Sequence, residues 1–240
     1  MKDFMRDLVY SSDDSDSWFY QKYFCGGANF RYWTFQLSLN ILRQTRENPT
    51  FVETGCQRME EDIGAGMSTS IFGEYCRRYG GQVFTVDLVK AHLNICRECT
   101  QQYKDLIHYI ESDSVAWLKS IRNLEADLLY LDSYDHPHFE ILNEYGGLTD
   151  MEKAARTVRD LGQKEILRRH GHLLKPCQEH CLNEFLAAES SGVVKKDTLV
   201  LIDDNQLAGG GKSRLLKDYL REHEWICLFD LQQSLWVRKV

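Results

Sequence analysis

The sequence predicts an α/β protein with a doubly wound, mainly parallel seven-stranded sheet that ends in an antiparallel hairpin. Two observations predict this class. From residue 50 onward, short apolar runs of strand length alternate with amphipathic stretches of helix length. Such alternation favours a parallel sheet whose two faces are both covered by helices. The last two strands are separated only by Leu231 and Gln232, so they form a hairpin in which one strand runs antiparallel.

Each expected element is a run whose hydrophobic pattern has the period of a strand or of a helix. The first helix shows the helical period, because its apolar residues fall on one stripe at Ile71, Phe72, Tyr75, Cys76 and Tyr79. In chain order, the expected strands are Thr50–Thr54, Gln82–Asp87, Leu106–Glu111, Ala126–Asp132, Thr198–Asp203, Trp225–Asp230 and Gln233–Lys239. The expected helices are Ser68–Tyr79, His92–Tyr103, Cys177–Ala188 and Lys212–His223.

Length and composition favour one globular domain over residues 1–240, with 43% hydrophobic and 27% charged residues. No apolar run approaches the ~20 residues of a membrane span, and the N-terminal MKDFMRDLVY lacks the apolar core of a secretion signal. We therefore expect a cytoplasmic protein without a membrane partner, whose eight cysteines are reduced thiols. The net charge of −7 disfavours nucleic acid as a partner.

Two regions do not follow the alternation of strands and helices. Residues 1–49 form an aromatic N-terminal extension, with nine aromatic residues between Trp18 and Phe35. Residues 136–175 form a long insertion between two strands, with a charged helical middle at Asp150–Arg169. Both regions are candidates for a lid or for contacts in a homo-oligomer. The alternative is that they simply cover the sheet.

Polar residues follow the predicted strands at the places where the strands end. In open α/β sheets, ligands bind beyond the carboxyl ends of the strands. Carboxylates are costly to gather there unless something polar or cationic lies between them. The five strand ends are Glu53-Thr54-Gly55, Asp87, Glu111-Ser112-Asp113, Asp132-Ser133-Tyr134-Asp135 and Asp203-Asp204-Asn205.

The segment after the first strand has the composition of a ligand-binding loop. Gly64 and Gly66 lie just before a predicted helix that starts near Ser68 and Thr69. Free backbone N–H groups and hydroxyls at a helix start suit a carboxylate or a phosphate. Asp87, at the end of the second strand, is placed to hold a ribose diol. Together these features favour a cofactor that contains a nucleoside over a merely capped helix.

The ordered set Glu-Thr-Gly, Gly-x-Gly, strand-end Asp87, Leu-Tyr-Leu-Asp132 and Leu-Ile-Asp-Asp204-Asn205, followed by a hairpin, resembles a class I S-adenosylmethionine-dependent methyltransferase. The resemblance covers about residues 50–240 and implies the Rossmann-like methyltransferase fold. It implies that Gly55, Gly64 and Gly66 lie against the methionine part, that Asp87 holds the ribose and that Asp113 or its neighbours approach the adenine. The expected cofactor site also includes Glu53, Ser68, Thr69 and Asp132.

The chain departs from this family in its glycine loop. The loop glycines are usually close together, whereas the segment Cys56–Ile63 intervenes here. It carries the acids Glu60, Glu61 and Asp62, which either meet the ammonium group of the cofactor or are solvated.

The set Asp132, Asp204 and Asn205 resembles the metal site of catechol-type O-methyltransferases. Two carboxylates and an amide oxygen are hard ligands that suit Mg²⁺. Such an ion would hold the oxygens of a substrate and lower the pKa of the attacking hydroxyl. The alternative is that these side chains cap helices or bind loop backbone. The expected function is methyl transfer to an oxygen of a small molecule or a sugar.

The candidate general bases are Asp135, His136, His138 and His180, since a histidine has a pKa near working pH. Catechol-type members carry a lysine shortly after the first metal aspartate. Asp135 stands at that place, so this lysine cannot be transferred to the present chain. Lys212 is a further candidate from the neighbouring loop.

The segment NQLAGGGKSRLL (residues 205–216) follows a strand and precedes a helix, as the phosphate-binding loop of a phosphotransferase or NTPase would. The consensus for that loop requires a glycine where Gln206 stands. A flexible hinge before a helix is the better alternative. An NAD-dependent dehydrogenase and a noncatalytic Rossmann-like scaffold are further alternatives.

Two cysteine-containing segments are candidates for a zinc site, and for both the alternative is packing in the core. Cys96 and Cys99 have a spacing that puts both on the core face of a helix. Within residues 170–181 and just beyond, Cys177, Cys181 and Phe185 repeat every four residues, as a buried helix stripe does.

Overall fold

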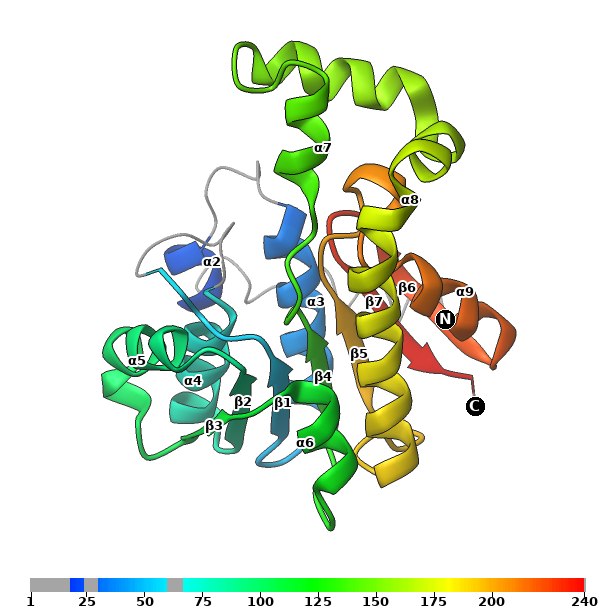
Figure 1. The fold of residues 1–240 in the computed structure, drawn as a ribbon. Helices are drawn as coiled ribbons and strands as arrows, with labels where there is room; N and C mark the ends of the chain where they lie inside the picture. The colour runs from blue at the N-terminus through cyan, green and yellow to red at the C-terminus, as the bar shows by residue number, and fades with distance from the viewer. Residues whose placement is uncertain (1–17, 24–29, 60–66, 240) are drawn as a thin grey trace.

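The computed structural model describes residues 18–23, 30–59 and 67–239, and these residues form a layered α/β structure around one sheet (Figure 1). The sheet has seven strands in the order β3-β2-β1-β4-β5-β7-β6. Neighbours pair in parallel except at β7, which is antiparallel to both β5 and β6. This confirms the predicted fold class. The strands are β1 (Thr50–Thr54), β2 (Gln82–Asp87), β3 (Ile107–Glu111), β4 (Leu128–Leu131), β5 (Leu199–Ile202), β6 (Trp225–Asp230) and β7 (Ser234–Arg238).

Several strands are shorter than predicted at their ends. The pairing of β4 with β5 stops at Leu131 and Ile202, so Asp132 and Asp203 lie just beyond the ladder. A polar residue directly after a buried strand can turn its side chain toward the edge of the sheet without disturbing the ladder. The early end of these strands therefore places their acids where a ligand would bind.

The helices fill the intervals between the strands. They are α2 (Trp18–Tyr23), α3 (Phe30–Thr45), α4 (Ser68–Tyr79), α5 (Lys90–Cys99), α6 (Ser114–Ser120), α7 (His138–Glu144), α8 (Met151–Ser191) and α9 (Arg214–Glu222). The helix predicted at Cys177–Ala188 is the last part of α8. The helix predicted from Lys212 begins two residues later, so Lys212 itself lies in the preceding turn.

Helix α8 is capped at both of its ends. The Asp150 side chain accepts a hydrogen bond from the Lys153 N–H (2.9 Å), and Gly192 ends the helix in a left-handed conformation. Its regular geometry is interrupted at Gly162, where φ is 74°. Helix α7 and the first part of α8 rise above the carboxyl ends of the strands (Figure 1).

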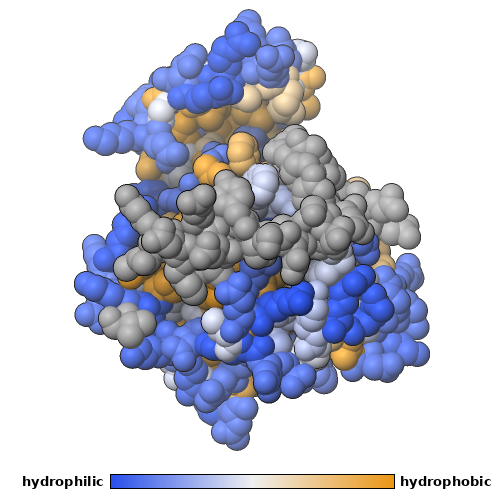
Figure 2. Space-filling model, turned by 180° about the vertical axis from the view of Figure 1, so that it is seen from behind, coloured by the Kyte–Doolittle hydropathy of each residue, from blue (hydrophilic) through white to orange (hydrophobic). Residues whose placement is uncertain are grey.

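This raised part of residues 136–175 has a small core of its own. Its outer surface is largely hydrophilic, and hydrophobic residues gather on the side that faces the rest of the molecule (Figure 2). The small core consists of Ile141, Leu142, Ala154, Val158, Ile166 and Leu174, together with Ala208 from the loop after β5.

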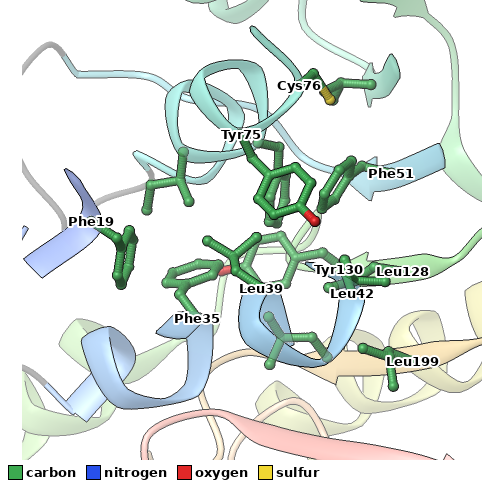
Figure 3. Close-up of a cluster of buried hydrophobic side chains, with 14 of the residues drawn as sticks. Phe19, Phe35, Leu39, Leu42, Phe51, Tyr75, Cys76, Leu128, Tyr130 and Leu199 are labelled. Carbon is green, nitrogen blue, oxygen red and sulfur yellow. The ribbon is translucent and has the colours of Figure 1, made fainter. Parts of the chain in front are cut away.

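One face of the sheet packs against α3 and α4 (Figure 3). Phe51 of β1 stacks on Phe72 of α4 with ring centroids 4.8 Å apart, and Phe35 of α3 meets Tyr130 of β4 edge-on at 5.6 Å. Most of the described aromatic residues of the N-terminal extension, including Phe19, are buried in this cluster. In this part of the chain, the extension therefore covers the sheet.

The other face packs against α6, α8 and α9. Successive residues of a strand point to opposite faces, so Leu129 and Leu131 lie on this side while Leu128 and Tyr130 lie on the first. The two buried faces are those of a doubly wound sheet.

The cysteines are part of the packing. Cys177 and Cys181 are buried, as the core stripe predicted. Cys96 is also buried, but Cys99 is half-exposed, so the prediction that both face the core is wrong for Cys99. The described cysteines form no disulfide with one another. In these ranges no helix is long and apolar enough to cross a bilayer.

Candidate functional site

A cleft of about 850 Å³ opens at the carboxyl ends of the strands. Pockets of this size hold small molecules and cofactors. The ends of β1, β2, β4 and β5 contribute to its walls, as do α6, α8 and Arg31 of α3. Nine of the predicted site residues line it, namely Gly55, Asp87, Asp113, Asp132, Asp135, His136, His138, His180 and Asp204. Gly64 and Gly66 lie outside the described residues.

Asp87 lies in one half of this cleft. Its Oδ1 accepts a hydrogen bond from the Val89 N–H (2.7 Å), and its Oδ2 accepts one from the Cys56 thiol (3.4 Å). The neighbouring apolar side chains are open to solvent, with 69% of Leu88 and 42% of Val89 exposed. A carboxylate beside exposed apolar side chains suits a ligand with a polar sugar and a flat base.

Gly55 lets the end of β1 approach the end of β4. Its φ is 83°, which favours glycine, and a β-carbon there would lie only 2.6 Å from the carbonyl oxygen of Asp132. This close backbone approach requires a glycine at position 55, whereas the contact of Gly55 with a cofactor stays a prediction.

Glu53, Ser68 and Thr69 do not line the cleft. Glu53 is fully buried, and its Oε2 accepts a hydrogen bond from the Thr69 hydroxyl (2.6 Å). The same hydroxyl accepts one from the Gln57 N–H (3.0 Å). Burial raises the pKa of Glu53 to about 7. These side chains tie β1 to α4, and their contact with a cofactor stays a prediction.

Two buried cations neutralise the aspartates after β4 and β5. The Arg31 Nε lies 2.9 Å from Asp203 Oδ2, and its Nη2 lies 3.0 Å from Asp204 Oδ1. The Lys212 ammonium pairs with Asp132 Oδ1 and lies 3.4 Å from Asp204 Oδ2. The strand ends were expected to need a cationic occupant, and the chain itself supplies two.

Lys212 stays protonated in this environment. Burial alone would lower its pKa, but the nearby carboxylates, led by Asp132, raise the pKa well above its ordinary value. An ammonium group held in this way is not a general base. It also points at carboxylates, which repel phosphate, so the geometry speaks against a phosphate-binding role for the glycine-lysine segment.

The residues expected to hold Mg²⁺ do not fit a divalent ion. The Lys212 ammonium lies between Asp132 and Asp204, where the ion would bind. Asn205 does not line the cleft, and its Nδ2 lies 3.5 Å from Asp230 Oδ1 on β6. In the described ranges, no three His, Cys, Asp or Glu side chains are arranged to hold a metal. The magnesium site implied by the resemblance is therefore not supported.

His180 of α8 lies at the wall of the cleft, next to a buried acid. Its Nε2 is 3.1 Å from the hydroxyls of Ser114 and Ser133, and 3.4 Å from Glu184 Oε1. Burial acts to lower the pKa of His180, but the hydrogen bond and charge of Glu184 outweigh it and raise the pKa. The Nδ1 atom makes no hydrogen bond with the part of the chain that the structure describes.

The other candidate bases are less suited to accept a proton. The His136 Nε2–H donates to the Ala208 carbonyl (2.9 Å), and burial lowers its pKa to about 4. Burial likewise lowers the pKa of His138. Asp135 is paired with Arg58 at 3.1 Å, and this pair outweighs burial and lowers the pKa of Asp135.

Two residues of the site, Arg31 and Glu184, were not predicted from the sequence. Arg31 gave no signal, because nothing in an aromatic helix shows that one arginine reaches strand ends more than 170 residues away. Glu184 did carry a signal. It follows His180 by four residues on a helix, a spacing that places the two side chains on one face.

No protein-family model and no curated protein sequence matches this chain. Among solved structures, the chain is similar to the SAH-bound methyltransferase PaMTH1 of Podospora anserina, at 12% identity and a TM-score of 0.53 over 98% of this chain and 88% of that one. It is also similar to a caffeoyl-CoA O-methyltransferase-like protein of Staphylococcus aureus, at 10% identity and a TM-score of 0.54 over 98% and 99%. These similarities establish the Rossmann-like methyltransferase fold.

Proposed function

We propose that this protein is an S-adenosylmethionine-dependent methyltransferase that acts on a hydroxyl oxygen of a small molecule or a sugar. One observation carries the proposal. A single cleft joins Asp87 and its exposed apolar neighbours to the His180–Glu184 pair. The first group suits a nucleoside and the second suits the removal of a proton. The likeness of the fold to methyltransferases supports the same class.

The residues of the first group fit the proposed cofactor. Asp87 would accept hydrogen bonds from the ribose hydroxyls, and Leu88 and Val89 would pack against the adenine. Asp113 also lines the cleft, where its Oδ1 caps α6 by accepting a hydrogen bond from the Ala116 N–H (2.8 Å). When bound, S-adenosylmethionine supplies an activated methyl group.

His180 would remove the proton of the acceptor hydroxyl. A proton on Nε2 is donated toward Glu184, which leaves the Nδ1 lone pair to accept the proton of the hydroxyl. The buried Glu184 carboxylate then stabilises the imidazolium that forms. Ser133 keeps Glu184 in place by donating its hydroxyl proton to Oε1 (2.6 Å).

The acceptor half of the cleft has an aromatic wall. Tyr134 and Phe139 line it and are 44% and 63% exposed. Tyr134 also lies against His180, with ring centroids 5.2 Å apart. Exposed rings beside a base suit a compact acceptor with a flat or apolar face and a hydroxyl group.

Calorimetric titration with S-adenosylhomocysteine, with ATP and NAD as controls, tests the proposed function. We expect S-adenosylhomocysteine to bind in the micromolar range, and ATP and NAD to bind much more weakly. Tighter binding of ATP would instead favour a phosphotransferase, and tighter binding of NAD a dehydrogenase. If none of the three binds, the proposal fails and a noncatalytic scaffold is favoured.

Asp87→Ala should weaken the binding of S-adenosylhomocysteine by about 10- to 100-fold, because hydrogen bonds to a charged group contribute about 1.5–3 kcal/mol. The matched control is Glu111→Ala. Glu111 is the exposed acid that pairs with Asp87 in the sheet register, and it does not line the cleft. Equal affinities of the two variants would remove Asp87 from the ribose role.

A further inference from the structure

We infer that Lys212 is a resident cation, which takes the place of a divalent ion between the ends of β4 and β5. Methyl transfer in this cleft then needs no metal. That second statement rests on the proposed function, whereas the occupancy of the site by Lys212 does not.

The surroundings of the ammonium group carry the inference. Three oxygens surround Lys212 Nζ: Asp132 Oδ1, Asp204 Oδ2 at 3.4 Å and the Tyr134 carbonyl at 3.5 Å. An ammonium has three N–H donors, so three oxygens satisfy it. Lys212 is only 2% exposed, and a buried lysine of this kind is stable as a cation only while these partners remain.

The triple glycine before Lys212 explains how its side chain reaches this place. Gly211 has a φ of 68°, and a β-carbon there would overlap the carbonyl oxygen of Asp204. The Gln178 side chain holds the loop by donating to the carbonyls of Gly209 (3.3 Å) and Gly211 (3.0 Å). The loop therefore lies directly on the end of β5. The segment that resembles a phosphate-binding loop presents its lysine to carboxylates.

A divalent ion would have to displace the ammonium. The two oxygens nearest to Nζ are those that the ion would need, and both cations at one place would repel each other strongly. Asp204 Oδ1 and Asp203 are already held by Arg31. Each of the three aspartates is thus paired with a cation that belongs to the chain.

Titration with Mn²⁺, followed by electron paramagnetic resonance, tests this inference without any turnover. We expect no stoichiometric Mn²⁺ site in the native protein. Lys212→Met removes the charge at nearly constant volume and leaves the three oxygens open, so this variant should bind Mn²⁺ at least about tenfold more tightly. The matched control is Lys217→Met, which breaks the pair of Lys217 with Asp230 on β6. It should bind Mn²⁺ as weakly as the native protein.

Stoichiometric Mn²⁺ binding by the native protein that is lost in Asp204→Asn would overturn the inference. So would a folded Lys212→Met protein, verified by circular dichroism, that gains no Mn²⁺ site. If Lys212→Met does not fold, Lys212→Gln serves as the second variant, because it retains a hydrogen-bond donor. The titration of the native protein tests independently whether the site is closed to Mn²⁺. Binding of S-adenosylhomocysteine is measured separately, so failure here differs from failure of the proposed function.

Discussion

Arg31→Met lowers the free energy of unfolding by about 3 kcal/mol at pH 7, the expected result of removing one partner from a buried ion pair. Arg31 is 8% exposed and Asp203 only 2%. Without the guanidinium, the Asp203 carboxylate keeps the Tyr130 hydroxyl (2.6 Å) but loses the cation paired with it. Urea unfolding at constant protein concentration measures the change.

The effect of this substitution depends on pH with a definite sign. Burial acts to raise the pKa of Asp203, but Arg31 and Lys212 outweigh it and hold the pKa below its ordinary value of 3.8. A carboxyl group with a lowered pKa in the folded state stabilises the fold above its unfolded pKa, and this stability is lost as the pH falls through the folded pKa. In the native protein this contribution should therefore be complete at pH 7 and be lost as the pH falls below about 4.

Two further variants separate this effect from a general loss of packing. Arg31→Met/Asp203→Asn should be more stable than Arg31→Met alone, because no unpaired charge remains buried. Arg46→Met is the matched control, since Arg46 pairs with Asp127 at 2.8 Å but both side chains are 28% exposed. It should cost no more than about 1 kcal/mol. Equal losses for the two arginines would show that the buried pair is not special.

The sequence was sufficient to predict the sheet because its information is local. Apolar runs with strand and helix periods survive as β1, β2, β6 and α4 with unchanged bounds. The hairpin of the last two strands follows from their short connection, which is Leu231–Gln233, one residue longer than predicted. The end of each parallel strand can also be recognised from its own segment of sequence. Asp87, Asp132 and Asp204 were therefore correctly expected at one edge of the sheet.

The partners of these acids could not be predicted in the same way. Sequence reasoning required a cation near Asp132 and Asp204 and assigned it to Mg²⁺, because a family resemblance offered that answer. The actual cations are Arg31 and Lys212, which reach the site from α3 and from the glycine turn after β5. Charge balance was a sound constraint, but only the tertiary arrangement shows which group satisfies it.

His180→Ala should reduce kcat by about 10²–10³-fold, because a positioned general base contributes roughly 10²–10⁴-fold to a rate. His180 lines the cleft, and its partners Ser114, Ser133 and Glu184 are not among the residues proposed to hold the ribose. Binding of S-adenosylhomocysteine should therefore change by less than about threefold. The matched control is His172→Ala, an exposed histidine on the same helix, which should leave kcat unchanged. The rates are measured with an acceptor found in a hydroxyl-compound screen.

The pH profile distinguishes a base from a residue that only shapes the cleft. The neutral imidazole of His180 is the active form, so kcat/KM should fall as the pH drops through a pKa above the ordinary value of 6.5. Glu184 is the group that raises this pKa, and Glu184→Gln should move the acidic limb of the profile to lower pH. If the acidic limb stays in place in Glu184→Gln, or persists in His180→Ala, then the limb reports the titration of another group. Both variants together thus test whether the proton leaves through His180, because a role in shape alone would change the rate at all pH values equally.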